Sequence, residues 1–233
     1  MTGLWHRRMP SRVADKGESI IQHERDDAVL IDPTARHRGF DFSYHMRRVC
    51  GDMVRRLPEL CHIELPAVAI GFAQARQAGP HGVQATLTPM RFKSGSLTTR
   101  RNGQTLTVQR FYDAEGTEML YLLSFYLPRF LDCPFEEKLV TILHELWHIS
   151  PHFNGDLRRY GGRCYAHGTS REKFDAVVQQ LARHWLAKEP PRHVHAFLSS
   201  DFRQLTRRYG RVQGTRIPTP RLIPLARTDS GAE

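Results

Sequence analysis

The segment DCPFEEKLVTILHELWHIS (residues 132–150) constrains the fold more than any other part of the chain, because its apolar residues recur with the period of an α-helix. At about 100° per residue, one side of this helix is apolar and the opposite side is polar. The apolar side consists of Phe135, Leu139, Ile142, Leu143, Leu146 and Ile149, and the polar side of Glu137, Thr141, His144, Glu145 and His148. The segment therefore predicts an amphipathic helix that packs one side against a core.

Both ends of this helix carry sequence signals. Asp132 or Cys133 is expected to cap the N-terminus, and Pro134 suits the first helical turn. Pro151 is expected to stop the helix within one turn of His148, because proline lacks the N–H group that a continuing helix needs. The pentapeptide HELWH therefore lies at the C-terminal end of the helix.

HELWH (residues 144–148) has the residue types and the spacing of a zinc site. His144 and His148 lie about one turn apart on the same face, so both imidazoles can reach one ion. Glu145 lies beside that position, where it can take a proton from a zinc-activated water and deliver it to a leaving amine. Solvated helix histidines would show the same spacing without a metal. We favour one catalytic Zn2+ bound by the two histidines, with Glu145 as the general base.

A catalytic zinc usually has a third protein ligand and one open position. The extended pattern HExxHxxGxxH is absent, because Pro151 replaces its glycine and Asn154 its last histidine. We favour His167, which lies 19 residues after the motif at the end of a loop that can return over the helix. The alternatives are His152, Glu172 in the first turn of the next helix and, as a thiolate, Cys164.

The rest of the chain predicts an α+β domain between two less regular segments. Helices are expected from residue 42 to 57, from 170 to 189 and from 194 to 208, and strands over 62–75, 83–92, 105–112 and 118–127. The last two strands flank DAEGT and are expected to pair as a hairpin, whereas residues 94–103 and 151–168 are expected to form loops. Residues 1–38 are expected to be a loosely ordered arm, 39–209 the domain, and 210–233 a basic, Pro- and Arg-rich tail.

Composition and cysteine usage indicate the class and the compartment. At 233 residues and 40% hydrophobic content, the chain can bury one sizeable core. Its four cysteines form no CxxC pair, which favours free thiols in a reducing compartment. The N-terminus lacks the apolar run of a signal peptide, and no stretch approaches the roughly 20 apolar residues of a membrane-spanning helix. We therefore expect a cytoplasmic protein that does not bind membranes.

HELWHISPHFNGDLRRYGGRCYAHG (residues 144–168), together with TLTPMRF and YLPRFLDCPFEEKLVTI before it, resembles the phage-type zinc metallopeptidase family of phages and prophage-bearing prokaryotes. The resemblance covers roughly residues 40–190. A remoter similarity is to SprT-like (Spartan-type) zincins, with His167–Gly168 and Phe174 in the places of their later His-Gly and aromatic residue, at wider spacing. The resemblance implies a zincin-like fold, in which a small, mostly antiparallel sheet packs on the HExxH active-site helix with flanking helices. It also implies zinc ligands at His144, His148 and His167, with Glu145 as the base.

A zincin also needs an oxyanion-binding group and an edge strand that docks the peptide. Tyr160, Arg163 and Tyr165 are possible donors, although aromatic and arginine residues in a glycine-rich loop are more often structural. Residues 118–127 and 83–92 compete as the edge strand, and the sequence does not distinguish them.

The charge distribution suggests a second function. The net charge is +10, and residues 183–227 carry ten Lys and Arg against two acids, a net charge of +8. A basic C-terminal region is typical of proteins that bind nucleic acid or acidic partners, although it can also be a solvated face. The first hypothesis is a zinc metalloendopeptidase with a protein or peptide substrate. The alternative is a basic nucleic-acid-binding protein with a degenerate or structural zincin-like core.

Overall fold

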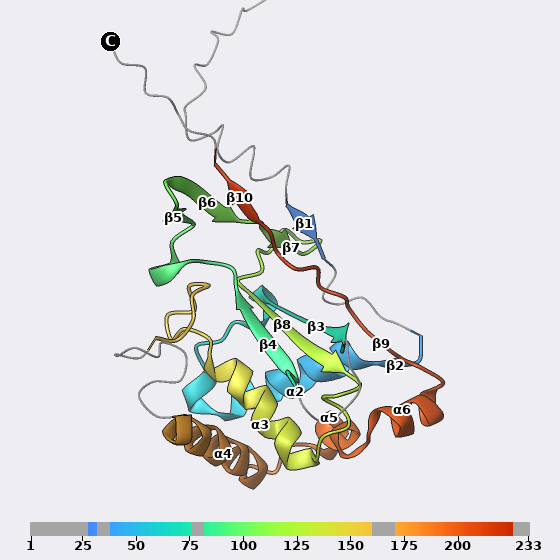
Figure 1. Cartoon of the computed structure of the whole chain (residues 1–233). Coiled ribbons are helices and arrows are strands. Elements are labelled where there is room, and N and C mark those ends of the chain that lie inside the picture. The colour runs from blue at the N-terminus through green and yellow to red at the C-terminus, as the bar shows by residue number, and fades with distance from the viewer. Residues whose placement is uncertain (1–27, 32–37, 76–81, 160–170, 226–233) are drawn as a thin grey trace, which may run out of the picture.

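The computed structural model describes residues 28–31, 38–75, 82–159 and 171–225, with side chains from residue 174 onward in the last range (Figure 1). The expected α+β class is confirmed. The described helices are α2 (Phe42–Arg56), α3 (Phe135–Trp147), α4 (Arg171–Ala187), α5 (Arg192–His195) and α6 (Phe202–Tyr209). In this part of the chain, no helix has the length and apolar character needed to cross a membrane.

The central sheet has the strand order β3-β8-β4, formed by β3 (Val68–Gln74), β8 (Tyr121–Leu127) and β4 (Ala85–Pro89). β8 is parallel to β3 and antiparallel to β4. The sheet is therefore mixed rather than mostly antiparallel. Residues 85–112 lie between β3 and β8 in the sequence, and this long connection allows β8 to run in the same direction as β3. β8, whose side chains are almost all apolar, takes the central position.

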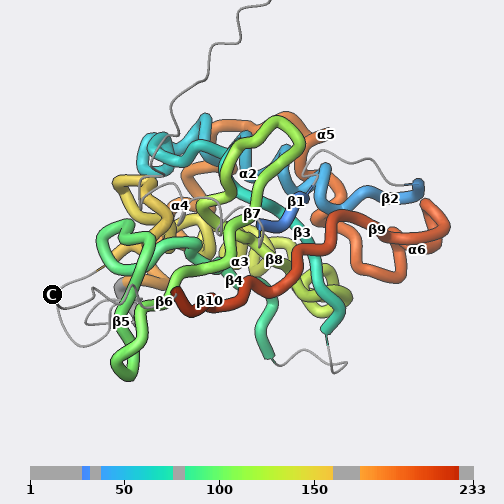
Figure 2. The backbone as a smooth tube through the Cα atoms, turned by 90° about the horizontal axis from the view of Figure 1, so that it is seen from above, coloured from blue at the N-terminus to red at the C-terminus, as the bar shows by residue number. Residues whose placement is uncertain are grey.

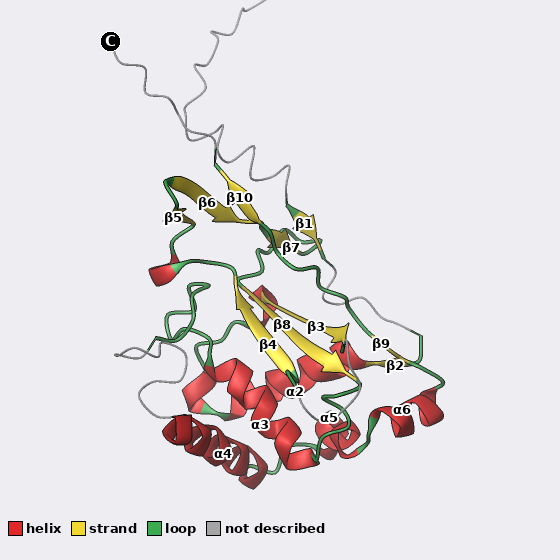
Figure 3. Ribbon diagram, in the orientation of Figure 1, coloured by secondary structure: helices red, strands yellow, loops and turns green. Residues whose placement is uncertain are grey.

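Two layers cover this sheet (Figure 3). The main core joins one face to α2, α3, α4 and α5, and its largest buried side chains include Trp185, Tyr121 and Phe42. A smaller core on the other face contains Ile31, Ala69, Met90, Phe111, Met119 and Leu122. Because side chains alternate along a strand, β8 contributes Tyr121 and Leu123 to the first core and Leu122 to the second.

A second sheet contradicts two of the expectations for residues 94–127. β5 (Thr98–Arg101), in the expected loop, pairs with β6 (Gln104–Val108) through a turn at Asn102–Gly103. Both turn residues have positive φ (50° and 76°), which Asn-Gly adopts readily, so this dipeptide was the hairpin signal. The expected hairpin of residues 105–112 with 118–127 is wrong. Of this hairpin, the structure contains the turn, which is closed by an antiparallel bridge between Tyr112 and Glu118. The strands β6 and β8 belong to different sheets.

The described parts of the terminal segments add strands to this framework. β1 (Val29–Leu30) pairs with β7 (Phe111–Tyr112), and β9 (Val212–Gln213) pairs with β2 (Phe40–Asp41). β10 (Leu222–Pro224) lies antiparallel to β6 and completes the order β10-β6-β5. Between β9 and β10, the carbonyl of Thr215 accepts a hydrogen bond from the N–H of Phe72 in β3 (3.0 Å). Residues 211–225 therefore pack along the domain.

The HELWH helix has the expected extent and orientation. Every expected apolar position of α3 is buried except Phe135, which packs against the main core at its margin. The cap is different: Pro134 is the N-cap residue and no side chain caps the helix. Asp132 instead accepts a hydrogen bond from the N–H of Phe202 (3.1 Å), and the Cys133 thiol donates to the carbonyl of Arg129 (3.2 Å). Both predicted capping groups are thus bound elsewhere, Asp132 by a tertiary partner and Cys133 by a residue in the preceding turn.

A buried carboxylate ties α4 to α2. Asp52, 2% exposed, accepts hydrogen bonds from Nε1 of Trp185 (2.9 Å), Nε of Arg56 (2.8 Å) and Nη2 of Arg55 (2.6 Å). Replacing Asp52 by alanine should lower the free energy of unfolding by about 2 kcal/mol, because it leaves a buried indole N–H without an acceptor. The Arg55 side chain is 71% exposed, so Arg55→Ala should cost less than about 0.5 kcal/mol. Urea denaturation of both variants measures the difference, and equal losses would contradict the assignment.

Candidate active site

The two histidines of HELWH lie together on the polar side of α3. His144 is in the last helical turn, and His148 is the C-cap residue with φ −69° and ψ −17°, still in helical geometry. Their ring centroids are 4.7 Å apart and the ring planes meet at 81°. Two imidazoles that bind one zinc ion at about 2.0–2.1 Å have centroids roughly 5 Å apart in tetrahedral geometry. The pair therefore fits a single zinc ion.

Phe174 on α4 fixes the orientation of both imidazoles. Its ring lies 4.8 Å from that of His144, edge to face, and 5.3 Å from that of His148, nearly stacked. The Phe174 side chain is only 4% exposed. The aromatic wall restricts the rotation of the two rings, so the site is partly organised by the packing of α4 against α3.

Glu145 points away from the solvent-facing side of α3 and toward β4. Its side chain is 9% exposed and accepts a hydrogen bond from the backbone N–H of Leu87. Burial raises the pKa of Glu145 to about 7, and the hydrogen bond from Leu87 offsets only part of that rise. The carboxylate therefore lies between the helix that bears the histidines and the nearest strand of the sheet.

Among the described residues, no strand pairs with the outer edge of β4, which lies beside Glu145. The N–H of Tyr126 in β8 donates to the carbonyl of Gln84 (2.8 Å), so even-numbered residues of β4 pair with β8. Because the bonds of an antiparallel ladder alternate, the backbone groups of Ala85 and Leu87 face outward. β8 is the central strand, so residues 83–92, and not 118–127, supply the edge strand.

A groove of about 480 Å³ runs between β4 and α3. Residues 82–85 line one wall, and Val140, Thr141, His144 and Glu145 line the other. At one end, Gln84 joins the two walls: its amide oxygen accepts from the Thr141 hydroxyl (2.6 Å), and its amide nitrogen donates to Glu137. The groove therefore runs along the start of β4 and is lined by both His144 and Glu145.

The chain turns tightly after α3 and secures the helix end. Residues 149 and 157 form an antiparallel bridge, so the first part of the expected 151–168 loop is an ordered turn. Arg158 donates from its backbone N–H to the carbonyl of His148 (2.7 Å) and from Nε to that of Trp147 (2.7 Å). Its Cζ also lies 4.1 Å from the centroid of the Trp147 ring. These contacts satisfy the terminal carbonyls of α3 and hold His148 in place.

Asp156 anchors the same turn to the strand layer. Its carboxylate, in a side chain 4% exposed overall, accepts from the N–H groups of Ser94 and Leu157 (both 2.8 Å) and from Nε and Nη2 of Arg159 (2.8 and 2.7 Å). The Tyr121 hydroxyl donates to the carbonyl of Asp156 (2.8 Å). Burial by itself raises the pKa of Asp156, but the hydrogen bonds from Arg159, Ser94 and Leu157 outweigh it and hold the pKa below its ordinary value.

Asp156→Asn should lower the free energy of unfolding by about 2 kcal/mol near neutral pH, because asparagine cannot accept all four hydrogen bonds. A lowered folded-state pKa contributes stability above the unfolded value of about 3.9, and this stability is lost as the pH falls through the folded value. The difference between wild type and Asp156→Asn should therefore narrow below about pH 4. Urea titrations near neutral pH and near pH 3 test this, and a constant difference would contradict it.

The predicted third ligand cannot be placed. His167, the alternative Cys164 and the oxyanion candidates Tyr160, Arg163 and Tyr165 lie outside the described residues, as does the side chain of Glu172. His152 is exposed in the turn after α3. Within the described ranges, no group of three or more His, Cys, Asp or Glu side chains is arranged to hold a metal.

Three contributors to the site were not recognised from the sequence: Gln84, the backbone N–H of Leu87, and Arg158. The alternation of polar and apolar residues in QATLTP was the available signal for a half-exposed strand such as β4. Comparison of the chain with family models, with curated proteins and with solved structures found no match. The function is therefore inferred from the geometry of α3, β4 and α4.

Proposed function

We propose that this chain is a zinc-dependent metallopeptidase with a zincin-like fold that hydrolyses peptide bonds through a zinc-activated water. The observation that carries the proposal is the position of Glu145. It is buried between two adjacent histidines of suitable separation and an open strand edge, at the end of a groove. Solvated histidines on a helix surface would need neither the buried carboxylate nor the edge strand.

His144 and His148 are the proposed zinc ligands, with His167 as the third. α4 begins at Arg171, and Phe174 in its first turn contacts both imidazoles. Three residues separate His167 from Arg171, so the Cα atoms of these two residues are at most roughly 14 Å apart, a distance that allows His167 to reach the pair. A bound zinc ion supplies a Lewis acid that lowers the pKa of a water molecule and polarises the scissile carbonyl.

Residues of the chain bind the substrate and transfer the proton. The outer edge of β4 binds the substrate backbone as an added strand, using the N–H and C=O groups of Ala85 and Leu87. When a substrate carbonyl accepts the hydrogen bond from the N–H of Leu87, it replaces the carboxylate of Glu145 as the acceptor. The carboxylate is then free to act as a base. Glu145, which lines the groove beside His144, then accepts a proton from water and returns it to the leaving amine.

The alternating edge of β4 gives a specific prediction for substrates. Once a cleavage site is known, peptides with a single N-methyl group at successive backbone positions should show a period of two. Methylation of an amide that faces β4 should raise KM by about tenfold or more, and methylation of its neighbours should have little effect, because only alternate amides face the strand. Steady-state kinetics on such a series tests this, and uniform effects at all positions would argue against strand addition.

A direct test of the proposal uses an unfolded protein as substrate. The substrate protein is kept unfolded by reduction and carboxymethylation. It is incubated with the zinc-loaded chain, and its fragments are identified by mass spectrometry. Cleavage should stop with 1,10-phenanthroline and return on addition of zinc. The Glu145→Gln variant, prepared in the same way, controls for contaminating proteases. Fragments that appear equally with wild type and with this variant would count against the proposal.

Binding to nucleic acid is a second candidate function of the basic C-terminal region. The observation that favours it is the exposure of the arginine side chains on α6 and along the chain that follows. This function does not require the zincin-like core to be degenerate, because these arginines are separate from the HELWH site.

A further inference from the structure

We propose that an extended arginine surface on this protein binds the phosphate backbone of nucleic acid. The surface, called the arginine surface below, consists of two parts of the chain that the fold joins. Its members are Arg203, Arg207, Arg208, Arg211, Arg216 and Arg221 of the C-terminal segment, with Arg100 and Arg101 of the β5–β6 hairpin. It goes beyond peptide hydrolysis and includes no residue of the candidate active site.

Both parts of the arginine surface lack acidic residues. From Phe202 to Leu225 the chain contains six arginines and no Asp or Glu. From Ala85 to Phe111 it contains five basic residues and again no acid. Surfaces that only keep a protein soluble usually mix both signs of charge. A surface of one sign instead creates a positive potential that attracts polyanions.

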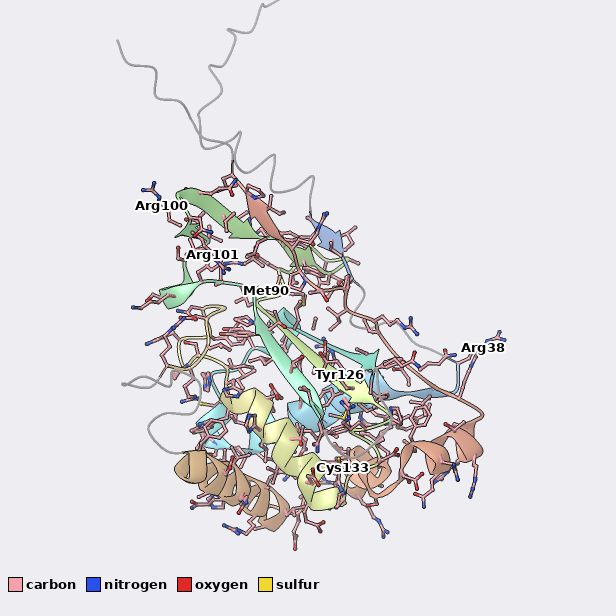
Figure 4. The ribbon with its side chains drawn as sticks, in the orientation of Figure 1. Arg38, Met90, Arg100, Arg101, Tyr126 and Cys133 are labelled. Carbon is pink, nitrogen blue, oxygen red and sulfur yellow. The ribbon has the colours of Figure 1, made fainter. Side chains whose placement is uncertain are left out.

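The fold connects the two parts into one path across the molecule (Figure 2). From α6 the chain passes through β9, runs beside β3 at Thr215, and reaches β10. β10 pairs with β6, and β6 pairs with β5, which carries Arg100 and Arg101. Figure 4 shows Arg100 at the outer end of the hairpin and Arg101 on the side nearer the body of the domain. An elongated path of this kind fits the repeated phosphates of a nucleic acid better than a small anion.

The side chains of the arginine surface reach solvent, and Arg211 also donates from Nε to the carbonyl of Arg38 (3.2 Å). All eight are exposed. Other arginines are held by carboxylates: Arg55 and Arg56 by Asp52, Arg91 and Arg110 by Glu118, and Arg159 by Asp156. In the described part of the chain, Arg207, Arg208 and the two hairpin arginines make no such ion pair. Guanidinium groups that are not paired within the protein can form two-pronged hydrogen bonds to phosphate oxygens.

The neighbouring groups also suit a nucleic acid rather than a membrane. Tyr209 at the end of α6 is 42% exposed, and the Cζ of Arg208 lies 5.3 Å from its ring centroid. The Tyr209 ring also packs against Phe40 (5.3 Å between centroids), and its exposed part, among arginines, can contact a base. The hairpin presents Thr98, Asn102 and Gln104, all exposed, which are typical donors to phosphate and sugar oxygens.

The test uses fluorescence anisotropy with labelled duplex DNA, single-stranded DNA and RNA, measured from about 50 mM to about 200 mM salt. Three double variants of the full chain each remove two positive charges: Arg207→Gln with Arg208→Gln, Arg100→Gln with Arg101→Gln, and a control, Arg183→Gln on α4 with Lys188→Gln directly after it. Point substitutions are necessary because deletion of residues 210–233 would remove β9 and β10, the partners of β2 and β6.

Each of the first two double variants should weaken binding roughly tenfold or more and reduce the slope of log affinity against log salt by about 2. The control should change affinity less than about twofold, and Glu145→Gln should bind as the wild type does. Absence of binding at low salt, equal losses in all three double variants, or equal competition by polyglutamate would each overturn the proposal. Peptide cleavage by the double variants should be unchanged, so failure here is distinct from failure of the metallopeptidase proposal.

Discussion

Replacing Glu145 by glutamine is expected to lower kcat/KM for peptide hydrolysis by roughly 10³-fold and to leave the bound zinc in place. Glutamine has nearly the same shape, and it can still accept the hydrogen bond from the N–H of Leu87. It cannot take a proton from water, and a general base contributes typically about 10²–10⁴ to the rate. The measurement is kcat/KM for a cleaved peptide, together with the zinc content of the same preparation.

The control for this variant is Glu137→Gln, at a carboxylate two turns earlier on α3 that is exposed at the far end of the groove. Since Glu137 lies two turns from the histidines and interacts with the side chains of Gln84 and Cys133, its loss should change kcat by less than about twofold. Full activity of Glu145→Gln would exclude Glu145 as the base, and loss of zinc from it would assign the carboxylate to metal binding instead.

Replacing His144 or His148 by alanine is expected to have the second largest effect, a loss of zinc affinity of more than about 100-fold and of all cleavage. Even groups that only support a ligand contribute about 10- to 100-fold to metal affinity, so a direct ligand should contribute more. Competition with a chromophoric chelator measures the dissociation constant. His184→Ala, at an exposed histidine on α4, is the matched control and should retain wild-type affinity.

Both histidine variants should fold, because each imidazole is only partly buried and contacts Phe174 at the margin of the core. Circular dichroism and urea denaturation separate a lost ligand from a lost fold. Unchanged zinc affinity in either variant would contradict the proposed role of that histidine.

The helix that carries HELWH could be predicted from the sequence because the signals for it are local. The apolar period of residues 135–149 sets which side of α3 is buried, and it places His144 and His148 together on the other side. The capping prediction was wrong because a capping side chain can instead bind a group from a distant part of the chain. The backbone N–H of Phe202, some 70 residues away in sequence, takes the carboxylate of Asp132 that could otherwise have capped α3.

The arrangement of the strands was less predictable because pairing joins distant segments. The continuous apolar run YLLSFYL of β8 is typical of a central strand, and the alternation in ATLTP of β4 is typical of an edge. These patterns could have identified the edge strand before the structure did. The parallel register of Val68 with Tyr121 has no comparable local signal, and the Asn102–Gly103 turn was overlooked within an expected loop.

The identity of the third ligand can be tested by comparing His167→Ala with His152→Ala and Glu172→Ala. Zinc binding should be lost with the first and kept with the other two. If Glu172→Ala alone loses the metal, the site has two histidines and a carboxylate from α4. If His152→Ala alone loses it, the turn after α3 contributes the ligand.

The central claim, that HELWH on α3 is a catalytic zinc site, is tested most directly by the metal content of the purified chain. Protein loaded with zinc and dialysed against a weak chelator is analysed by mass spectrometry of its metals, beside the double variant His144→Ala with His148→Ala. We expect about one zinc ion per wild-type chain and essentially none in the double variant, as for a single site with three protein ligands. A wild-type chain without stoichiometric zinc, or a double variant that keeps it, would contradict the claim.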